Sequence, residues 1–140
     1  MVQEFSSILI KTGRQGLYEF TSEVQERCSL ASVRNGLVNL SISHTSASLL
    51  IQENADPAVG VDIQNFFSHL VPRGPQYTHN SEGDDDMPAH IRTVLTNTNL
   101  AISVQNFELL LGVWQGLYVF EHRDSVQERT VFCHIIGDLG

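Results

Sequence analysis

The sequence predicts a single domain of the α+β class, and three observations support this prediction. The chain has 140 residues, which is the usual size of one domain and is enough to bury a hydrophobic core. Its hydrophobic fraction is 41% and its charged fraction is 17%, a balance typical of globular proteins. Segments with strand character outnumber the three helical segments, two of which lie in the first half, so the pattern differs from alternating βαβ units.

The chain begins with two predicted strands, at residues 4–10 and 16–20, with glycine turn signals between them. A helix follows, and its N-cap is expected at Thr21 or Ser22, because Ser22 begins a sequence with capping-box spacing. This helix is expected to end near Gly36, since glycine is a common helix stop.

Residues 36–43 and 47–53 predict a pair of strands joined by a short connection. The next helix is expected to begin after Asp56, which is a good N-cap, with Pro57 at its first position. The apolar spacing along this helix predicts an inward face made of Val61, Phe66, Phe67 and Leu70.

A polar loop rich in proline and glycine is expected over residues 72–86, and a short helix over residues 88–96. The rest of the chain predicts consecutive strands at residues 100–105, 109–112, 116–122 and 128–137. No linker or low-complexity segment separates these elements, so the predicted domain spans residues 1–140.

Composition argues against several classes of function. The formal net charge is −8 with only eight basic residues, which opposes binding to nucleic-acid phosphates and to acidic lipid. No apolar run approaches the ~20 residues of a membrane-spanning helix, and the N-terminus lacks the features of a signal peptide. We therefore expect a cytoplasmic protein without nucleic-acid or membrane partners, in which Cys28 and Cys133 are buried thiols.

Three histidines lie at positions that suit a metal site. His90 falls in the first turn of the predicted helix at residues 88–96, where the helix dipole disfavours imidazolium and leaves a lone pair available. His79 lies in the preceding loop, and His44 lies between two predicted strands. Together they fit the three-ligand arrangement of catalytic zinc, which keeps an open fourth position. Their spacing matches no local zinc motif, so the alternative of a solvated acidic loop, with residues 84–88 as an ordinary helix start, stays open.

The remaining polar residues have simpler interpretations. His69 is expected on the surface near the end of its helix, and His134 is expected to be a hydrogen-bonded core residue of a strand. In residues 114–123, period-two alternation places Gln115 and Glu121 on one face of a strand. We expect these two side chains to share a polar pocket.

Four separated stretches carry a family resemblance: HTSASLLIQENADP at 44–57, HN at 79–80, EGDDDMPAHI at 82–91 and WQGLYVFEHR at 114–123. In this order and spacing they are similar to the YjbQ family, whose members are described as secondary thiamine-phosphate synthases. The resemblance implies a small α+β fold with a β-sandwich-like core of antiparallel strands and two to three helices. It also implies a homotrimer with a divalent metal in a pocket at the subunit boundary, and we favour zinc over magnesium.

The resemblance further implies which residues form the site. The expected metal ligands are His44, His79 and His90. The expected pocket residues are Asn54, Asp86, Gln115 and Glu121. We assign catalysis to Glu121 and Asp86, and substrate binding to Asn54, Gln115, Arg123 and Ser46.

The resemblance implies an enzyme that joins a pyrimidine methyl diphosphate and a thiazole phosphate at a metal-dependent pocket. Release of diphosphate needs cationic donors, and Arg73, Arg92 and Arg123 are the candidates in an otherwise acidic chain, so we expect a weak, secondary transferase activity. One alternative is a metal-dependent hydrolase of a small ester or phosphoester, with Glu121 or Asp86 as the general base. Another is a non-catalytic protein that binds a small phosphorylated metabolite.

Overall fold

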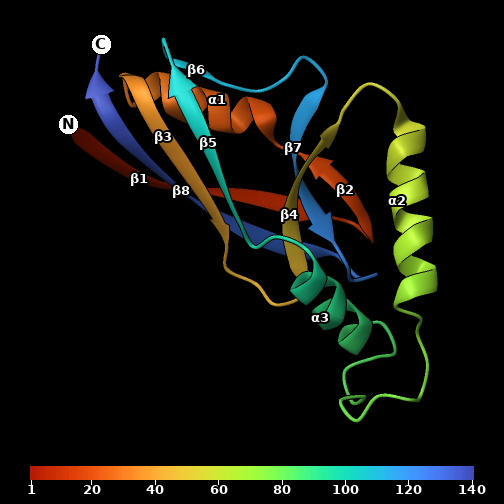
Figure 1. Cartoon of the computed structure of the whole chain (residues 1–140). Coiled ribbons are helices and arrows are strands. Elements are labelled where there is room, and N and C mark those ends of the chain that lie inside the picture. Colours follow the sequence, from red (N-terminus) through yellow and green to blue (C-terminus); the bar gives the residue numbers. More distant parts are fainter.

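Eight strands and three helices make up the chain in a computed structural model that describes residues 1–140 (Figure 1). The strands are β1 (Val2–Thr12), β2 (Gly16–Glu19), β3 (Val33–Ile42), β4 (Ala47–Glu53), β5 (Asn99–Gln105), β6 (Glu108–Leu109), β7 (Gln115–Glu121) and β8 (Gln127–Leu139). The helices are α1 (Thr21–Leu30), α2 (Pro57–Leu70) and α3 (Asp86–Leu95).

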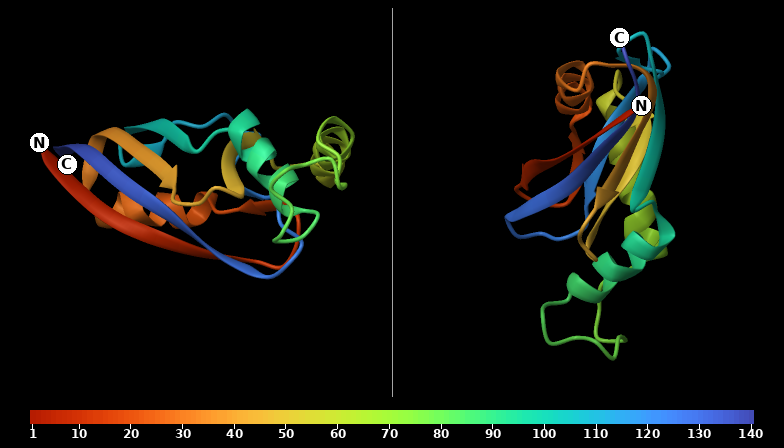
Figure 2. Two further views of the ribbon diagram at one scale, coloured as in Figure 1. Left: turned by 90° about the horizontal axis from the view of Figure 1, so that it is seen from below. Right: turned by 90° about the vertical axis from the view of Figure 1, so that its left-hand side faces the viewer.

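The strands form two antiparallel sheets, and the core lies between them. The larger sheet has the order β1-β8-β3-β5-β6 and the smaller sheet has the order β2-β7-β4. β1 pairs with β8 along its whole length, from Val2 opposite Gly137 to Thr12 opposite Gln127, so the two chain ends lie side by side (Figure 2). Eighteen buried hydrophobic residues from both sheets and α1 form one contiguous cluster. The predicted α+β class with antiparallel strands is therefore confirmed.

The predicted pairing of the third and fourth strands does not form. β3 pairs with β5 and β8 in the larger sheet, whereas β4 pairs with β7 in the smaller one. Leu40 of β3 and Leu49 of β4 are both fully buried, so the chain crosses between sheets at residues 43–46 and both strands face the same core. The prediction was wrong because strands adjacent in sequence pair often but not always, and alternation does not identify the partner.

Helix α1 differs from the prediction at both ends. Its N-cap is Phe20 and no side chain caps it, so the expected capping box of Ser22 is absent. The helix ends before the expected stop, because Gly36 lies within β3. A Cβ at Gly36 would overlap the carbonyl oxygen of Ile136 on β8, so glycine is needed here for close approach of two strands.

Helix α2 begins as predicted but does not bury the predicted face. Asp56 is its N-cap and accepts a hydrogen bond from the helix backbone, with Pro57 at the first position. Phe67 packs edge-on against Phe120 of β7, with ring centroids 5.4 Å apart. No residue of α2 is fully buried, and three of the four residues predicted to face inward are exposed: Val61, Phe66 and Leu70. Helix α2 therefore stands beside the smaller sheet rather than covering it (Figure 1).

The remaining elements follow the prediction, except that residues 110–112 lie outside β6. Cys28 and Cys133 are buried and free, as predicted, and burial together with the charge of Cys133 raises the pKa of Cys28 to about 11. None of the three helices combines the length and the apolar character needed to cross a membrane. The segment between α2 and α3 extends away from the sheets together with α3 (Figures 1 and 2).

Two histidines outside the proposed site, His69 and His134, differ in how well their burial was predicted. His69 is exposed on α2, as predicted, and its Nδ1 lies 2.8 Å from the carbonyl oxygen of Asn65. His134 is only half-buried and stacks on Phe5 with ring centroids 4.2 Å apart, so the predicted core position is wrong. The predicted hydrogen bond is present, because its Nε2 lies 2.9 Å from Oε1 of Gln3. Strand periodicity identified its strand but not which face meets the core.

Candidate metal centre

Three side chains from α3 and from the loop before it converge on one point. Suitable ligand atoms of His79, Asp86 and His90 all lie within 4.8 Å of one another. Asp86 begins α3 and His90 follows four residues later, so the helix brings both to the same side. His79 comes from the preceding loop, and its Nε2 lies 2.7 Å from Oδ2 of Asp86. The cluster therefore combines two imidazoles with one carboxylate.

Asp86 is buried at the centre of this cluster and is kept ionised. Burial alone would raise its pKa, but the hydrogen bond from His79 and the charges of His90 and Arg123 outweigh burial and lower the pKa below the ordinary value. Arg123 donates from Nη1 to Oδ1 of Asp86 over 2.7 Å. This leaves Oδ2 directed at the two histidines.

His90 is held in a single tautomer by the backbone. Its Nδ1 lies 2.8 Å from the carbonyl oxygen of Thr45, and because that oxygen only accepts, Nδ1 must carry a hydrogen. In the neutral imidazole, Nε2 then carries the lone pair. Nε2 lies 3.3 Å from Oδ2 of Asp86, so a lone pair faces a carboxylate unless a proton or a metal ion lies between them.

The arginine expected to bind substrate instead organises the loop. Arg123 donates from Nε to Asp85 over 3.0 Å and from Nη2 to the carbonyl oxygen of Glu82 over 3.0 Å, in addition to its contact with Asp86. Burial opposes ionisation of Asp85, yet the backbone of Asp124 and the guanidinium of Arg123 lower the pKa of Asp85. Within this chain the guanidinium is already occupied by protein acceptors and is not free to hold an anion.

His44 lies next to the cluster but does not belong to it. Its Nε2 accepts a hydrogen bond of 2.8 Å from the backbone N–H of Thr130, which occupies the only lone pair of a neutral imidazole. Burial and the charge of Arg129 lower the pKa of His44, against the opposing charge of Glu121, and so favour this neutral form. His44 instead lines a pocket of about 380 Å³ with His90 and four threonines: Thr45, Thr93, Thr96 and Thr98.

Glu121 is fully buried in a hydrogen-bond network that does not include His79, Asp86 or His90. Arg129 donates to both of its carboxylate oxygens, over 2.7 Å from Nε and 2.6 Å from Nη2. Thr12 and the backbone N–H groups of His122 and Arg123 complete the set. Both oxygens are therefore filled, which argues against Glu121 as a general base.

Ser46, expected to contact substrate, belongs to the same buried network. Nη2 of Arg129 lies 3.0 Å from the hydroxyl of Ser46 and 3.3 Å from its carbonyl oxygen. Arg129 thereby ties the crossing at residues 43–46 to Glu121 on β7. The role that the contacts support for Ser46 and Glu121 is to hold this crossing, and with it the backbone that carries His44 and the carbonyl of Thr45.

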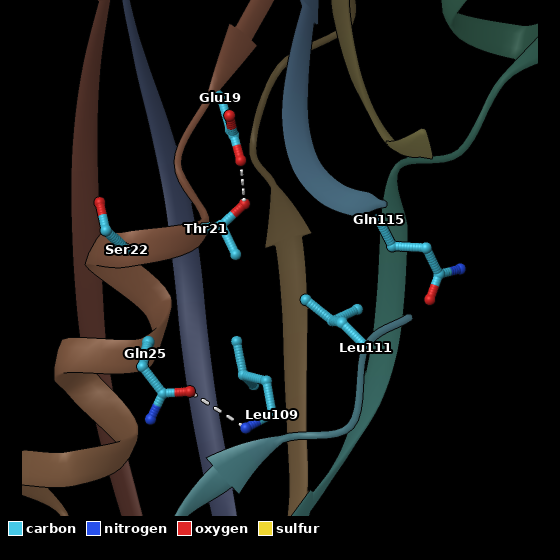
Figure 3. Close-up of a pocket in the computed structure, with 7 residues that line it drawn as sticks. All are labelled: Glu19, Thr21, Ser22, Gln25, Leu109, Leu111 and Gln115. Carbon is cyan, nitrogen blue, oxygen red and sulfur yellow. Dashed lines mark hydrogen bonds between the residues drawn. The ribbon is translucent and has the colours of Figure 1, made fainter. Parts of the chain in front are cut away.

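Asn54 and Gln115 lie at the opposite end of the smaller sheet. Ala47 is opposite Glu121 and Glu53 is opposite Gln115, so six residues of strand, about 20 Å, separate the two ends. Gln115 accepts from the backbone N–H of Gly112 and lines a separate cavity of about 600 Å³ with Glu19 and Thr21 (Figure 3). The expectation that Gln115 and Glu121 share a pocket is therefore wrong within one chain.

Two buried side chains, Arg92 and His122, carry polar atoms without partners, and local sequence patterns do not indicate this burial. Nε and Nη1 of Arg92 and Nδ1 of His122 are buried without hydrogen-bond partners. Nε2 of His122 lies 2.9 Å from the hydroxyl of Ser48, which also contacts Thr96 at 2.6 Å. Burial and the charges of Arg92 and Arg129 lower the pKa of His122 to about 3, so this imidazole stays neutral. Asp86 was predicted to act in catalysis rather than as a metal ligand. The sequence does contain a signal for the ligand role, because the i,i+4 spacing of Asp86 and His90 indicates a shared ligand pair.

Comparison with known proteins gives a consistent family assignment. The model of a family described as UPF0047 protein YjbQ-like matches residues 6–138. A UPF0047 protein of Synechocystis is 45% identical over 133 residues, covering 94% of this chain and 90% of that protein. UPF0047 protein YjbQ of Salmonella typhimurium is 36% identical over 133 residues, covering 94% of this chain and 96% of its own length.

Solved structures agree with the fold. An uncharacterized conserved protein of the YjbQ/UPF0047 family from Clostridium acetobutylicum matches with a TM-score of 0.86 at 32% identity, covering 94% of this chain and 99% of that one. A YbjQ-like protein of unknown function from Sulfolobus solfataricus matches with a TM-score of 0.90 at 22% identity, covering 98% of this chain and 99% of that one. Because the identity of the second match is only 22%, it supports the fold alone.

Proposed function

The chain belongs to the UPF0047 protein YjbQ-like family, and from that premise we propose that it is a metal-dependent hydrolase of a small ester or phosphoester. The proposed metal ligands are His79, Asp86 and His90. Two imidazoles and one carboxylate favour zinc over magnesium, because magnesium prefers oxygen ligands and retains several waters. Three protein ligands leave positions open for water or substrate.

The observation that carries this proposal is the contact between Nε2 of His90 and Oδ2 of Asp86. The backbone carbonyl of Thr45 accepts the Nδ1 hydrogen of His90, so Nε2 is the ring nitrogen that faces the carboxylate 3.3 Å away. A metal ion held there would find a ring nitrogen and a carboxylate oxygen directed at it from the same turn of α3. The hydrogen bonds around these ligands also fit a metal site. Metal-binding histidines usually donate their other N–H to a carbonyl or carboxylate, as His90 does to Thr45. Ligating carboxylates are usually hydrogen-bonded themselves, as Asp86 is to Arg123.

A divalent ion held there would supply Lewis acidity and lower the pKa of a water that it binds. The chain must then supply a base, and Glu82 is the best placed. Its Oε2 lies 3.7 Å from Nε2 of His79, and its side chain is 64% exposed. Glu121 is fully buried, and Asp86 is used as a ligand in this proposal, so neither serves as the base.

The neighbouring pocket suggests the class of substrate. His44 keeps a hydrogen on Nδ1 because Nε2 accepts from Thr130, and the hydroxyls of Thr45 and Thr98 add further donors. The hydroxyls of Thr93 and Thr96 already donate to the carbonyl oxygens of Ala89 and Arg92. Donors without a free cation suit a small anion of low charge. A volume of about 380 Å³ suits a substrate at the small end of the ligand range.

Thiamine-phosphate synthase activity, implied by the family resemblance, is the second candidate. The donor-lined pocket beside the ion favours it, because a phosphate group of either substrate would find hydroxyl and imidazole donors there. Against it, nearby arginines are already paired, Arg123 with Asp85 and Asp86, and Arg73 with Asp84 and Asp124. A diphosphate would depend on the ion for its charge balance. We therefore propose this reaction only as a weak side activity.

The test measures metal content and turnover in the same preparations. Wild-type protein is expected to hold about one zinc per chain and to hydrolyse p-nitrophenyl acetate or p-nitrophenyl phosphate, with loss on chelation and recovery on adding zinc. Glu82→Gln should lower turnover by about 10²-fold or more without lowering metal content, because a general base contributes about 10²–10⁴-fold. The matched control Glu26→Gln changes an exposed carboxylate on α1 and should alter neither.

Two results would overturn the hydrolase proposal. One is that neither ester is hydrolysed by zinc-loaded protein, and the other is that chelation leaves turnover unchanged. A parallel assay with the pyrimidine diphosphate and thiazole phosphate substrates separates the two candidates. Chelator-sensitive synthesis without ester hydrolysis would favour the synthase, whereas metal binding without either activity would favour a binding protein.

A further inference from the structure

A groove of about 470 Å³ lies between α2 and the smaller sheet, lined by Glu53 at the end of β4 and by residues 15–17 at the start of β2. Within the groove, α2 approaches β2 most closely at Gly60, where a Cβ would lie 3.3 Å from a methyl group of Leu17. On either side of this contact the helix leaves space, consistent with the absence of fully buried residues on α2. The groove is large enough for a small organic molecule.

The groove is lined by two carboxylates, four side-chain amides and the phenol of Tyr118, and by no basic side chain. Glu53 and Asp56 both contribute carboxylates, and neither forms a salt bridge. One oxygen of Asp56 caps α2, which leaves the other unassigned. The amide nitrogen of Asn54 donates to Glu19, so its oxygen is also left as an acceptor.

A buried atom adds an independent observation. Oε1 of Gln64, on the α2 wall of the groove, is buried and has no hydrogen-bond partner. A buried acceptor without a donor costs stability, and native proteins rarely keep one without a reason. The other buried side-chain atoms without partners all belong to Arg92 and His122, which lie outside this groove.

We infer that this groove binds a small organic cation bearing N–H donors, such as an amine or a guanidine. The carboxylates of Glu53 and Asp56 would balance its charge. Oε1 of Gln64, which is buried in the ligand-free chain, would accept one of its hydrogens after the amide turns into the groove. Leu17, Val61 and the ring of Tyr118 offer apolar surface for a carbon chain. A bare metal ion does not need this volume, and a phosphorylated molecule would be repelled by two unpaired carboxylates.

This site is independent of the proposed metal centre. β4 runs from Ala47 to Glu53, and the metal-side contact of His90 is made to Thr45, just before β4 begins. Glu53 lies about 20 Å along the strand from this end, and the groove shares no residue with the metal cluster. Binding in the groove should be the same in metal-free and metal-loaded protein, so either proposal can fail without the other.

The test uses agmatine, which carries an ammonium and a guanidinium group, in calorimetric titrations of the full chain at low ionic strength. Wild-type protein is expected to bind about one molecule per chain. Glu53→Gln and Gln64→Met should each weaken binding by about tenfold or more, since the first removes a counter-charge and the second removes a hydrogen-bond acceptor for a charged group. Asp56→Asn should weaken binding while the helix persists, because asparagine also caps helices well. His90→Ala should leave agmatine affinity unchanged.

Three results would overturn the inference. They are no binding of agmatine at millimolar concentration, unchanged affinity in a folded Glu53→Gln, Gln64→Met double variant, and equal binding of a neutral sugar. Circular dichroism of each variant checks the fold. Gln64→Met carries a second readout: because it removes an unpartnered buried acceptor, it should raise the melting temperature of the ligand-free protein while weakening binding. A lowered melting temperature would indicate a structural role for Gln64 instead.

Discussion

Nε2 of His90 and Oδ2 of Asp86 lie 3.3 Å apart, and Nδ1 of the same ring donates to the carbonyl oxygen of Thr45. Their positions one helical turn apart make the contact a property of α3 itself. His79, from the loop, approaches the same carboxylate oxygen at 2.7 Å. The loop geometry depends in turn on Arg123, which binds Asp85, Asp86 and the carbonyl of Glu82.

The first prediction follows from this contact. His90→Ala should reduce zinc content from about one per chain to near zero, because removing one of three protein ligands leaves too few to hold the ion. His69→Ala is the matched control, since His69 is an exposed histidine on α2 and should leave zinc content unchanged. Elemental analysis of both proteins after dialysis measures the effect. Zinc retained in folded His90→Ala would contradict the proposed ligand set.

The second prediction concerns the buried network on β7. Glu121→Gln should lower the free energy of unfolding by about 3–5 kcal/mol, because it leaves Arg129 buried without its counter-charge. Glu128→Gln is the control, since Glu128 pairs with Lys11 at 4.0 Å on the surface, where such pairs contribute about 0–1 kcal/mol. Urea denaturation of the three proteins gives both values.

This prediction also separates a structural role of Glu121 from a catalytic one. If Glu121 only supports the backbone, folded Glu121→Gln protein should keep its zinc and most of its turnover. A stable variant with turnover reduced by about 10²-fold or more would instead restore Glu121 as the general base.

The third prediction concerns pH. Burial lowers the pKa of His122 from 6.5 to about 3, so between these values the unfolded chain takes up a proton at this position and the folded chain does not. Stability is therefore complete above about pH 6.5 and falls as pH decreases, by about 2 kcal/mol at pH 5 from His122 alone. His122→Gln should be less stable at pH 7.5 but lose less on going to pH 5. An equal loss in wild type and variant would contradict a neutral buried His122.

Local signals in the sequence were enough to identify most elements of this fold. Asp56 followed by Pro57 marks the start of α2, and strand alternation locates β4 and β7. What local patterns do not contain is the pairing of strands far apart in the chain. The crossing at residues 43–46 and the exposed apolar face of α2 both depend on such long-range packing, and both were predicted incorrectly.

In the candidate site, too, local patterns predicted some residues but not the contacts made by distant parts of the chain. His79 and His90 were predicted from a loop and a helix start, and the structure brings them together around Asp86. His44 was placed in the same group by type and position, but its lone pair is taken by a backbone N–H on β8, a contact that no local pattern specifies. The role of Glu121 likewise depends on Arg129, which approaches it only because β7 and β8 belong to different sheets that face each other.

The outer face of the larger sheet carries exposed apolar side chains. Phe5 is 74% exposed, Leu9 57% and Phe132 50%. The register of β1 and β8 places Ser7 opposite Phe132, between Phe5 and Leu9, so the three apolar side chains share one face. A second exposed set lies on α2, namely Val61, Phe66 and Leu70. Apolar surface gathered in this way often marks contacts between proteins.

The last prediction is that the protein forms a homotrimer that covers at least one of these surfaces. Light scattering should give about three times the chain mass of 15.6 kDa. Phe132→Ser removes an apolar ring from the sheet face, and Phe66→Ser removes one from α2, so the variant that falls to the monomer mass identifies the surface that is buried. Each serves as the control for the other, because both change an exposed phenylalanine. A wild-type mass of 15.6 kDa at micromolar concentration would contradict the prediction, and both apolar surfaces would then remain exposed in the isolated protein.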